Sequence, residues 1–150
     1  RDAADALIEM LLPLAEIITP NIPEAEVLSG IRIRDREGMK EAARIITRST
    51  GTNILIKGGH FPEGADDLLV RRDGREKWFL AARIDNPNTH GTGCTLSSAI
   101  ACGLAEGLSV EESVRAAKDY ITDALKSGLD LGRGSGPLDH CCRLRKQVAK

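Results

Sequence analysis

Residues Gly91, Thr92, Gly93 and Cys94 place two glycines and a thiol directly before an apolar helical pattern. Glycines let a backbone approach a ligand closely, and the first N–H groups of a helix have no partner within that helix. Such a helix start binds anions, and it would stabilise a phosphate or the charge on a phosphoryl group in transfer. The alternative is a tight turn that leads into a core helix, and the spacing alone leaves both interpretations open.

Cys94 would lie at this helix start, where the positive end of a helix dipole favours the thiolate form of a cysteine. A thiolate there could accept a proton from a substrate hydroxyl group. The alternative is a structural role as a small packed side chain. We expect that second role for Cys102, which lies two turns further along the same helix.

Two further polar motifs each follow a strand-like apolar run, Asn21 with Glu24 after the first run and Lys57 with Gly59 after the second. Open α/β sheets bind ligands at the carboxyl ends of their strands, so Glu24 is a candidate magnesium ligand and Lys57 a candidate phosphate partner. Plainer interpretations also stand. Asn21 and Glu24 fit a reciprocal helix cap, and Lys57 fits a solvated lysine beside a turn.

Alternating helical and strand-like segments surround these motifs. Such alternation predicts a three-layer αβα protein with a mostly parallel sheet, and the pair Asp73-Gly74 predicts an added β-hairpin. A capping box of Ser109 and Glu112 marks the start of the clearest helix. The predicted helices cover residues 3–12, a short segment around Pro23 that runs to Leu28, and residues 35–49, 95–105 and 110–127. The predicted strands cover residues 14–18, 53–56, 66–71 and 76–81.

Composition narrows the function classes. The chain has 150 residues, 41% of them hydrophobic, and a formal net charge of −1, which fits one globular domain and lacks the basic excess of a nucleic-acid binder. No apolar run approaches the about 20 residues that a membrane span needs. Four cysteines without C-x-x-C spacing favour a cytoplasmic protein with free thiols, and the three histidines lack metal-ligand spacing.

Residues 18–25, 56–60 and 88–100 resemble, in this order, hydroxymethylpyrimidine/phosphomethylpyrimidine kinases of thiamine biosynthesis, which belong to the ribokinase-like superfamily. The run Asn-Thr-His-Gly-Thr-Gly-Cys at residues 88–94 is the most specific part. The resemblance implies that residues 1–140 are the C-terminal half of a ribokinase-like kinase domain, followed by a frayed basic tail at residues 141–150. The start at Arg1, within helix-like sequence, also suggests a piece of a longer chain.

The resemblance further implies a chemistry: ATP-dependent phosphorylation of hydroxymethylpyrimidine and then of its monophosphate, with Mg²⁺. Cys94 would be the catalytic base and Glu24 the residue nearest the metal. The implied anion hole is Gly91, Thr92, Gly93 and Cys94, and the implied nucleotide contacts are Asn21, Lys57, Gly59 and Thr89.

The family's members are about twice this length, so we expect the chain alone to have little activity, an unpaired sheet edge and exposed apolar helix faces. The expected partners are a small pyrimidine substrate and either the missing N-terminal half or a second copy of the chain. Two other functions stay open. One is a pyridoxal or other vitamin-precursor kinase, and the other is a non-catalytic nucleotide-binding or assembly module.

Overall fold

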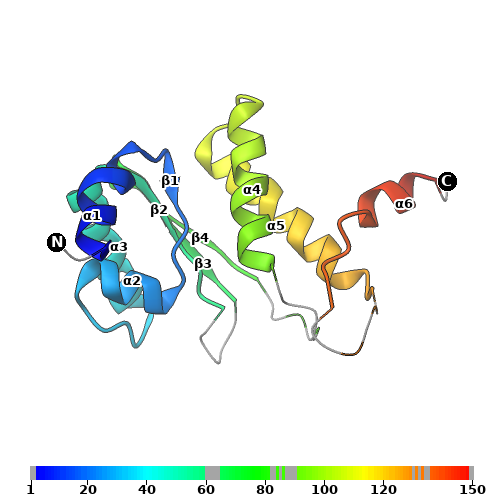
Figure 1. Cartoon of the computed structure of the whole chain (residues 1–150), viewed down its shortest axis with the longest axis horizontal. Coiled ribbons are helices and arrows are strands. Elements are labelled where there is room, and N and C mark those ends of the chain that lie inside the picture. Colours follow the sequence, from blue (N-terminus) through cyan, green and yellow to red (C-terminus); the bar gives the residue numbers. More distant parts are fainter. Residues whose placement is uncertain are drawn as a thin grey trace. The chain divides into compact units, whose positions relative to one another are not determined.

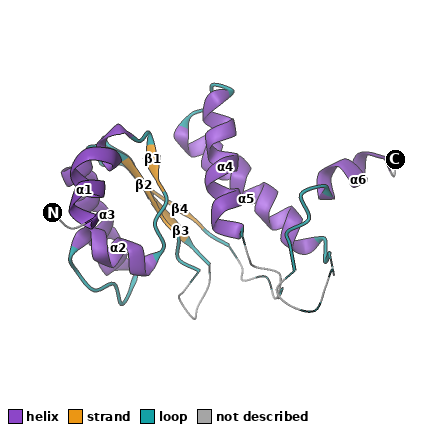
Figure 2. Ribbon diagram, in the orientation of Figure 1, coloured by secondary structure: helices purple, strands orange, loops and turns teal. Residues whose placement is uncertain are grey.

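The computed structural model describes residues 3–59, 65–81, 84, 86, 91–129, 131, 133 and 136–148. The chain folds as two compact units, Arg1–Arg83 and Ile84–Lys150. Figures 1 and 2 show an α/β unit followed by a helical unit. Among the described residues, no helix is both long enough and apolar enough to cross a membrane.

The first unit begins with a helical segment that changes type along its length. The helix predicted over residues 3–12 is α-helical only over Ala3–Ala6 (α1), then forms a π turn over Leu7–Leu11 (η1) and a 3-10 turn over Leu12–Leu14 (η2). Pro13 lacks the N–H that an α-helix would use at this point. The strand predicted from residue 14 therefore starts later and is only Ile17–Ile18 (β1).

The remaining elements of this unit follow the predicted order closely. Asp35 caps the helix that begins at Arg36 by accepting a hydrogen bond from the Gly38 N–H, and Gly51 ends this helix with a φ of 71°. These elements are α2 (Ile22–Ser29), α3 (Arg36–Thr50), β2 (Asn53–Ile56), β3 (Asp67–Val70) and β4 (Glu76–Phe79).

The four strands form one mixed sheet in the order β1-β2-β3-β4. β1 and β2 are parallel, whereas β2–β3 and β3–β4 are antiparallel. The α/β class and the hairpin at Asp73-Gly74 are confirmed, with Gly74 at a φ of 83°. Among the described strands, however, parallel pairing is limited to β1–β2. The connection from Ile56 to Asp67 is shorter than the dozen or so residues that a parallel crossover needs.

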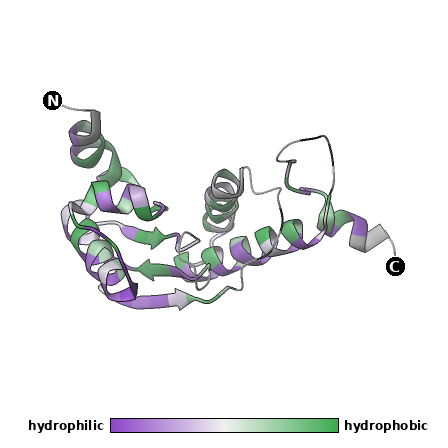
Figure 3. Ribbon diagram, turned by 90° about the horizontal axis from the view of Figure 1, so that it is seen from below, coloured by the Kyte–Doolittle hydropathy of each residue, from purple (hydrophilic) through white to green (hydrophobic). Residues whose placement is uncertain are grey.

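A continuous apolar core joins α3 to the sheet. Met39 and Ile46 on α3 are fully buried, as are all the apolar residues of β2 and β3. β4 instead exposes Glu76 and Lys77, and Figure 3 shows this edge strand mostly in the hydrophilic colour. Every residue of β2 is buried, as is typical of a strand that is covered on both faces. This packing supports the residues that follow β2.

The second unit consists of α4 (Thr92–Ala105), α5 (Val110–Lys126) and α6 (Cys142–Val148). α4 and α5 approach closely at Gly103, where an added Cβ would lie 2.9 Å from the Ser113 hydroxyl oxygen. The segment expected to be a frayed tail contains α6. Buried Cys142 packs with Ala124 and Leu138, and Arg143 donates to Asp123 at 2.9 Å.

Candidate functional site

The N-terminus of α2 is closed by its own side chains. Asn21 Oδ1 accepts from the Glu24 backbone N–H at 2.8 Å, and Glu24 Oε2 accepts from the Asn21 N–H at 2.7 Å. The predicted reciprocal cap is therefore confirmed as a structural feature. The hydrogen bond from the Asn21 N–H uses one of the two carboxylate oxygens of Glu24.

A magnesium ion at Glu24 would need further ligands. The described part of the chain holds no group of three or more His, Cys, Asp or Glu side chains that could bind a metal. Mg²⁺ is usually held by one or two carboxylates together with substrate phosphates and water, rather than by a cage of protein groups. Glu24 fits that kind of site and does not fit a site built from protein ligands alone.

Lys57 lies beside Asn21. The two residues form an isolated parallel bridge just beyond β1 and β2, and the Lys57 N–H donates to the Pro20 carbonyl oxygen at 2.9 Å. Two motifs that lie 36 positions apart in the sequence are thus neighbours at the carboxyl ends of two parallel strands. This is the edge at which open α/β sheets bind ligands.

The glycines after Lys57 have different structural roles from those expected. At Gly58, an added Cβ would collide with the Asp66 carbonyl oxygen, and the Gly58 N–H donates to Asp67 Oδ1 at 3.0 Å. At the predicted nucleotide contact Gly59, the space around an added Cβ is open. Asp67 was missed by the sequence analysis, although an acidic residue heading an apolar strand is the signal that could have indicated it. His60 lies outside the described residues.

The N-terminus of α4 contrasts with the side-chain-capped starts of α2, α3 and α5. Its N-cap residue, Gly91, has a φ of 81° and provides no side-chain cap, and the first turn carries no acidic residue. The helix begins at Thr92, earlier than the predicted residue 95. Thr92, Gly93 and Cys94 are therefore the first three residues of the helix rather than a loop before it. Thr89 lies outside the described residues.

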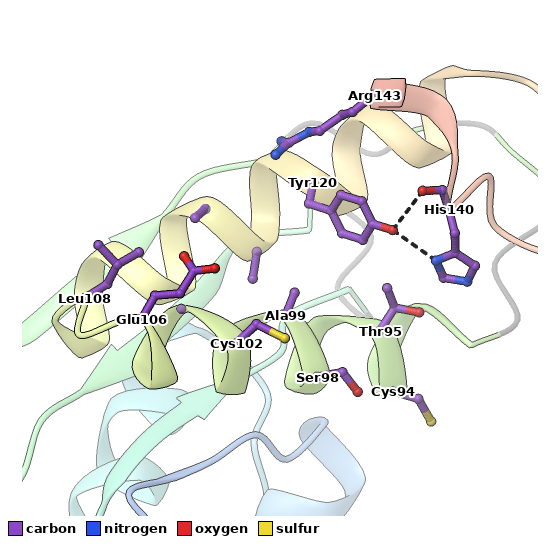
Figure 4. A pocket seen from close by; sticks show the side chains of 13 residues that line it. Cys94, Thr95, Ser98, Ala99, Cys102, Glu106, Leu108, Tyr120, His140 and Arg143 are labelled. Atoms are coloured by element: carbon purple, nitrogen blue, oxygen red, sulfur yellow. Dashed lines mark hydrogen bonds between the residues drawn. The ribbon is translucent and has the colours of Figure 1, made fainter. Parts of the chain in front are cut away.

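Cys94 is exposed and lies at one end of a groove of about 550 Å³ within the second unit (Figure 4). Ser98 and Cys102 follow along α4 at intervals of four residues, so all three side chains share one face of the helix. The expectation that Cys102 is buried is wrong, because this face of α4 opens into the groove.

Tyr120 and His140 form the polar part of the groove. The Tyr120 hydroxyl oxygen lies 3.1 Å from His140 Nδ1 and also donates to the His140 carbonyl oxygen at 3.3 Å. The guanidinium group of Arg143 lies 5.4 Å from the centre of the Tyr120 ring. Burial raises the pKa of Tyr120 above the ordinary value of 10.0, at which a phenol is already protonated near neutral pH, so its hydroxyl group can act as a donor.

An α/β fold with polar motifs at two strand ends and a glycine-capped helix start defines a candidate phosphate-binding protein. A family model described as phosphomethylpyrimidine kinase matches residues 1–139. The chain therefore belongs to the phosphomethylpyrimidine kinase family.

The chain is similar both to phosphomethylpyrimidine kinases and to a pyridoxal kinase. The chain is 48% identical to the hydroxymethylpyrimidine/phosphomethylpyrimidine kinase of Streptomyces coelicolor, over 92% of this chain and 51% of that protein. An ADP complex of Bacillus subtilis pyridoxal kinase superposes with a TM-score of 0.84 at 40% identity, over 95% of this chain and 54% of that one. Phosphomethylpyrimidine kinase from Clostridium difficile superposes with a TM-score of 0.68 at 42% identity, over 80% of this chain and 47% of that one. The chain thus spans about half the length of these relatives.

Proposed function

We propose that this chain is the C-terminal half of a kinase that uses ATP to phosphorylate hydroxymethylpyrimidine and its monophosphate in thiamine biosynthesis. The observation that carries the proposal is the N-terminus of α4, which has a glycine at positive φ, no side-chain cap and no acidic residue in its first turn. A helix start of this kind attracts phosphate through its amide groups and dipole. The family match and the kinase relatives support the same chemistry.

In this proposal, Gly91, Thr92, Gly93 and Cys94 form the anion hole for the phosphoryl group in transfer. In the first reaction, the substrate hydroxyl oxygen forms a bond to the terminal phosphorus of ATP as the bond to the ADP oxygen breaks, and the hydroxyl proton passes to the Cys94 sulfur. In the second reaction, an oxygen of the monophosphate makes the same attack and the same bond to ADP breaks. Phosphoryl transfer depends mainly on positioning and charge stabilisation. The base acts late, when charge has already developed on the attacking oxygen, so a thiolate is basic enough.

The carboxyl ends of β1 and β2 would hold the nucleotide side of the reaction. Asn21, Lys57 and Gly59 are the proposed nucleotide contacts there, and Thr89 is a further proposed contact. Glu24 would bind Mg²⁺ together with phosphate oxygens. The adjacency of Asn21 and Lys57 supports a common ligand for the two motifs.

A pyridoxal kinase is the second candidate function. Its support is the TM-score of 0.84 with the Bacillus subtilis pyridoxal kinase, against 0.68 with the Clostridium difficile phosphomethylpyrimidine kinase. The two relatives are almost equally identical in sequence, at 40% and 42%. The choice between these substrates therefore needs a direct measurement.

We also propose that the chain requires a complementary half. Met10 and Leu14 are exposed apolar side chains in the first helical segment, and Leu14 is 81% exposed. β1 is a two-residue strand at the end of the strand order. An upstream half like that of the relatives would cover such surfaces, and a second copy of the chain is the alternative. All four cysteines are free, which suits the reducing cytoplasm proposed as its location.

The test compares this chain alone with a chimaera in which the N-terminal half of the Streptomyces coelicolor relative precedes it. A coupled assay would follow ADP release with hydroxymethylpyrimidine, its monophosphate or pyridoxal. We expect turnover of the pyrimidines by the chimaera and little by the chain alone. Preference for pyridoxal would favour the second candidate. ATP binding by a folded chimaera without phosphate transfer to any of the three would instead identify a non-catalytic module.

A further inference from the structure

One buried carboxylate holds the turn that follows β2. Asp67, the first residue of β3, is only 7% exposed, and its Oδ1 accepts from the Gly58 N–H at 3.0 Å. A polar side chain taken out of water requires hydrogen-bond partners, and this bond gives one to the Asp67 side chain while it fixes the Gly58 amide. The bond therefore stabilises both the buried acid and the conformation of the turn.

Two backbone contacts fix the same turn. The Lys57 N–H donates to the Pro20 carbonyl oxygen at 2.9 Å, beside Asn21. Gly58 is packed so closely on the start of β3 that an added Cβ would collide with the Asp66 carbonyl oxygen. The turn is thus held through Lys57 by the segment that follows β1, and through Gly58 by the start of β3.

We infer that Asp67 is a positioning residue for nucleotide binding. By holding Gly58, it keeps Lys57 next to Asn21 and presents the lysine to the phosphates of the nucleotide. The effect on ATP rests on the function proposed above. The effect on the turn follows from the geometry alone, so the two parts can be tested separately.

The chain offers a matched control in Asp66. Its Oδ1 also accepts from a backbone N–H, that of Ala81 at 3.0 Å, and its Oδ2 pairs with Arg36. Asp66 and Asp67 are adjacent acids at the start of one strand, but they hold different backbone segments. Asp66→Ala therefore removes the same chemical group without removing the acceptor for Gly58.

The first experiment measures amide hydrogen exchange of the 150-residue chain by NMR. We expect Asp67→Ala to increase exchange at the Gly58 amide at least about tenfold relative to Asp66→Ala, because a buried acceptor has been lost. Asp67→Asn keeps an acceptor oxygen and should restore protection, which also covers the case in which Asp67→Ala does not fold. Unchanged Gly58 exchange in Asp67→Ala, or no protection in a folded Asp67→Asn protein, would overturn the inference.

The second experiment titrates the same variants with ATP and Mg²⁺ after they are built into the chimaera described above. We expect Asp67→Ala to bind ATP roughly tenfold more weakly than Asp66→Ala, and the loss to disappear when Lys57→Ala is already present, because the two residues act as one unit. Additive losses in the double variant would overturn the positioning role. If the wild-type chimaera binds no ATP, the proposed function fails, whereas the exchange experiment still decides the role of Asp67 in the turn.

Discussion

The N-termini of α2 and α4 differ in whether a capping side chain accepts a hydrogen bond from their first amide groups. At α2, Asn21 and Glu24 bond to each other's backbone N–H groups and form a complete capping box. At α4, Gly91 supplies no side-chain cap, and the first turn holds no acidic residue. Asp35 and Ser109 cap α3 and α5 through their side chains, as Asn21 caps α2, so α4 differs from all three of these helices.

This difference distinguishes two roles that a helix start can have, which are stabilisation of the helix itself and binding of an outside anion. A helix start that is capped by its own side chains gains stability, while one that begins at a glycine leaves the dipole for an outside anion. For Asn21 and Glu24 the structural role is therefore established, and their proposed ligand role is additional to it. At residues 91–94, the N-cap residue is a glycine, so it has no side chain that would compete with a phosphate for the amide groups of the helix start.

Of the changes that test this difference between the two helix starts, removal of the Cys94 thiol should have the largest effect, and it should act on the catalytic rate. In the chimaera, we expect Cys94→Ala to lower kcat by about 10²–10⁴-fold with little change in the KM for ATP, because a positioned base contributes a factor of this size. The coupled assay measures both constants. The control is Cys102→Ala, which removes an exposed thiol from the same helix face and should leave kcat unchanged. Equal effects of the two substitutions would contradict a base at Cys94.

A charge at the start of α4 should have the next largest effect. We expect Gly91→Asp to weaken ATP binding roughly tenfold or more, because a carboxylate would repel phosphate and compete for the same amide groups. Isothermal titration would measure the affinity. Gly91→Asn is the matched variant, since asparagine tolerates positive φ and carries no charge. If the Asp and Asn variants bind ATP equally well, the helix start does not bind phosphate.

Loss of the α2 cap should act on stability. Asn21→Ala removes the acceptor for the Glu24 N–H, so we expect the free energy of unfolding to fall by about 1 kcal/mol. Urea denaturation would measure this change. Asn21→Ser keeps a capping oxygen and should lose less stability. An Asn21→Ala protein as stable as the wild type would mean that the cap contributes nothing.

The smallest predicted effect is a pH dependence at α5. Hydrogen bonds from the Ser109 hydroxyl and backbone N–H lower the pKa of Glu112 below its ordinary value of 4.5. The cap therefore stabilises fully above about pH 4.5, and its contribution is lost as the pH falls through the lowered pKa. We expect the Tm difference between wild type and Glu112→Gln to shrink over that range. Glu111→Gln, in the same turn but outside the cap, should show less change, and a Glu112 difference that stays constant down to about pH 2 would refute the assignment.

Much of the fold could be predicted because its signals are local. Each of three correctly predicted features is formed by residues that are close together in the sequence. They are the β2 strand at residues 53–56, the Asp73-Gly74 hairpin and the Ser109–Glu112 capping box. The N-terminal segment was harder to predict. Its apolar spacing indicates a helix, but no residue of η1 is buried, so no packing energy holds that turn in α-helical form.

The candidate site was predicted less completely. The sequence indicated Asn21, Glu24 and Lys57, but not that Asn21 and Lys57 form a bridge. It indicated Gly59 as a nucleotide contact, which stays a prediction, and did not indicate the close contact at Gly58. It also placed Cys102 in the core, although helix periodicity gives only the face on which a side chain lies and not what covers that face.

The sequence by itself determined the α/β class, the helix caps, the hairpin and the glycines at the start of α4, because neighbouring residues control backbone dihedral angles and local hydrogen bonds. Only the tertiary structure decided which strand ends meet, which glycine must be a glycine, and which acid holds the turn after β2. These features depend on contacts between residues that are distant along the chain. Asp67 reaches Gly58 because β3 pairs antiparallel with β2, and residue spacing alone does not specify that pairing.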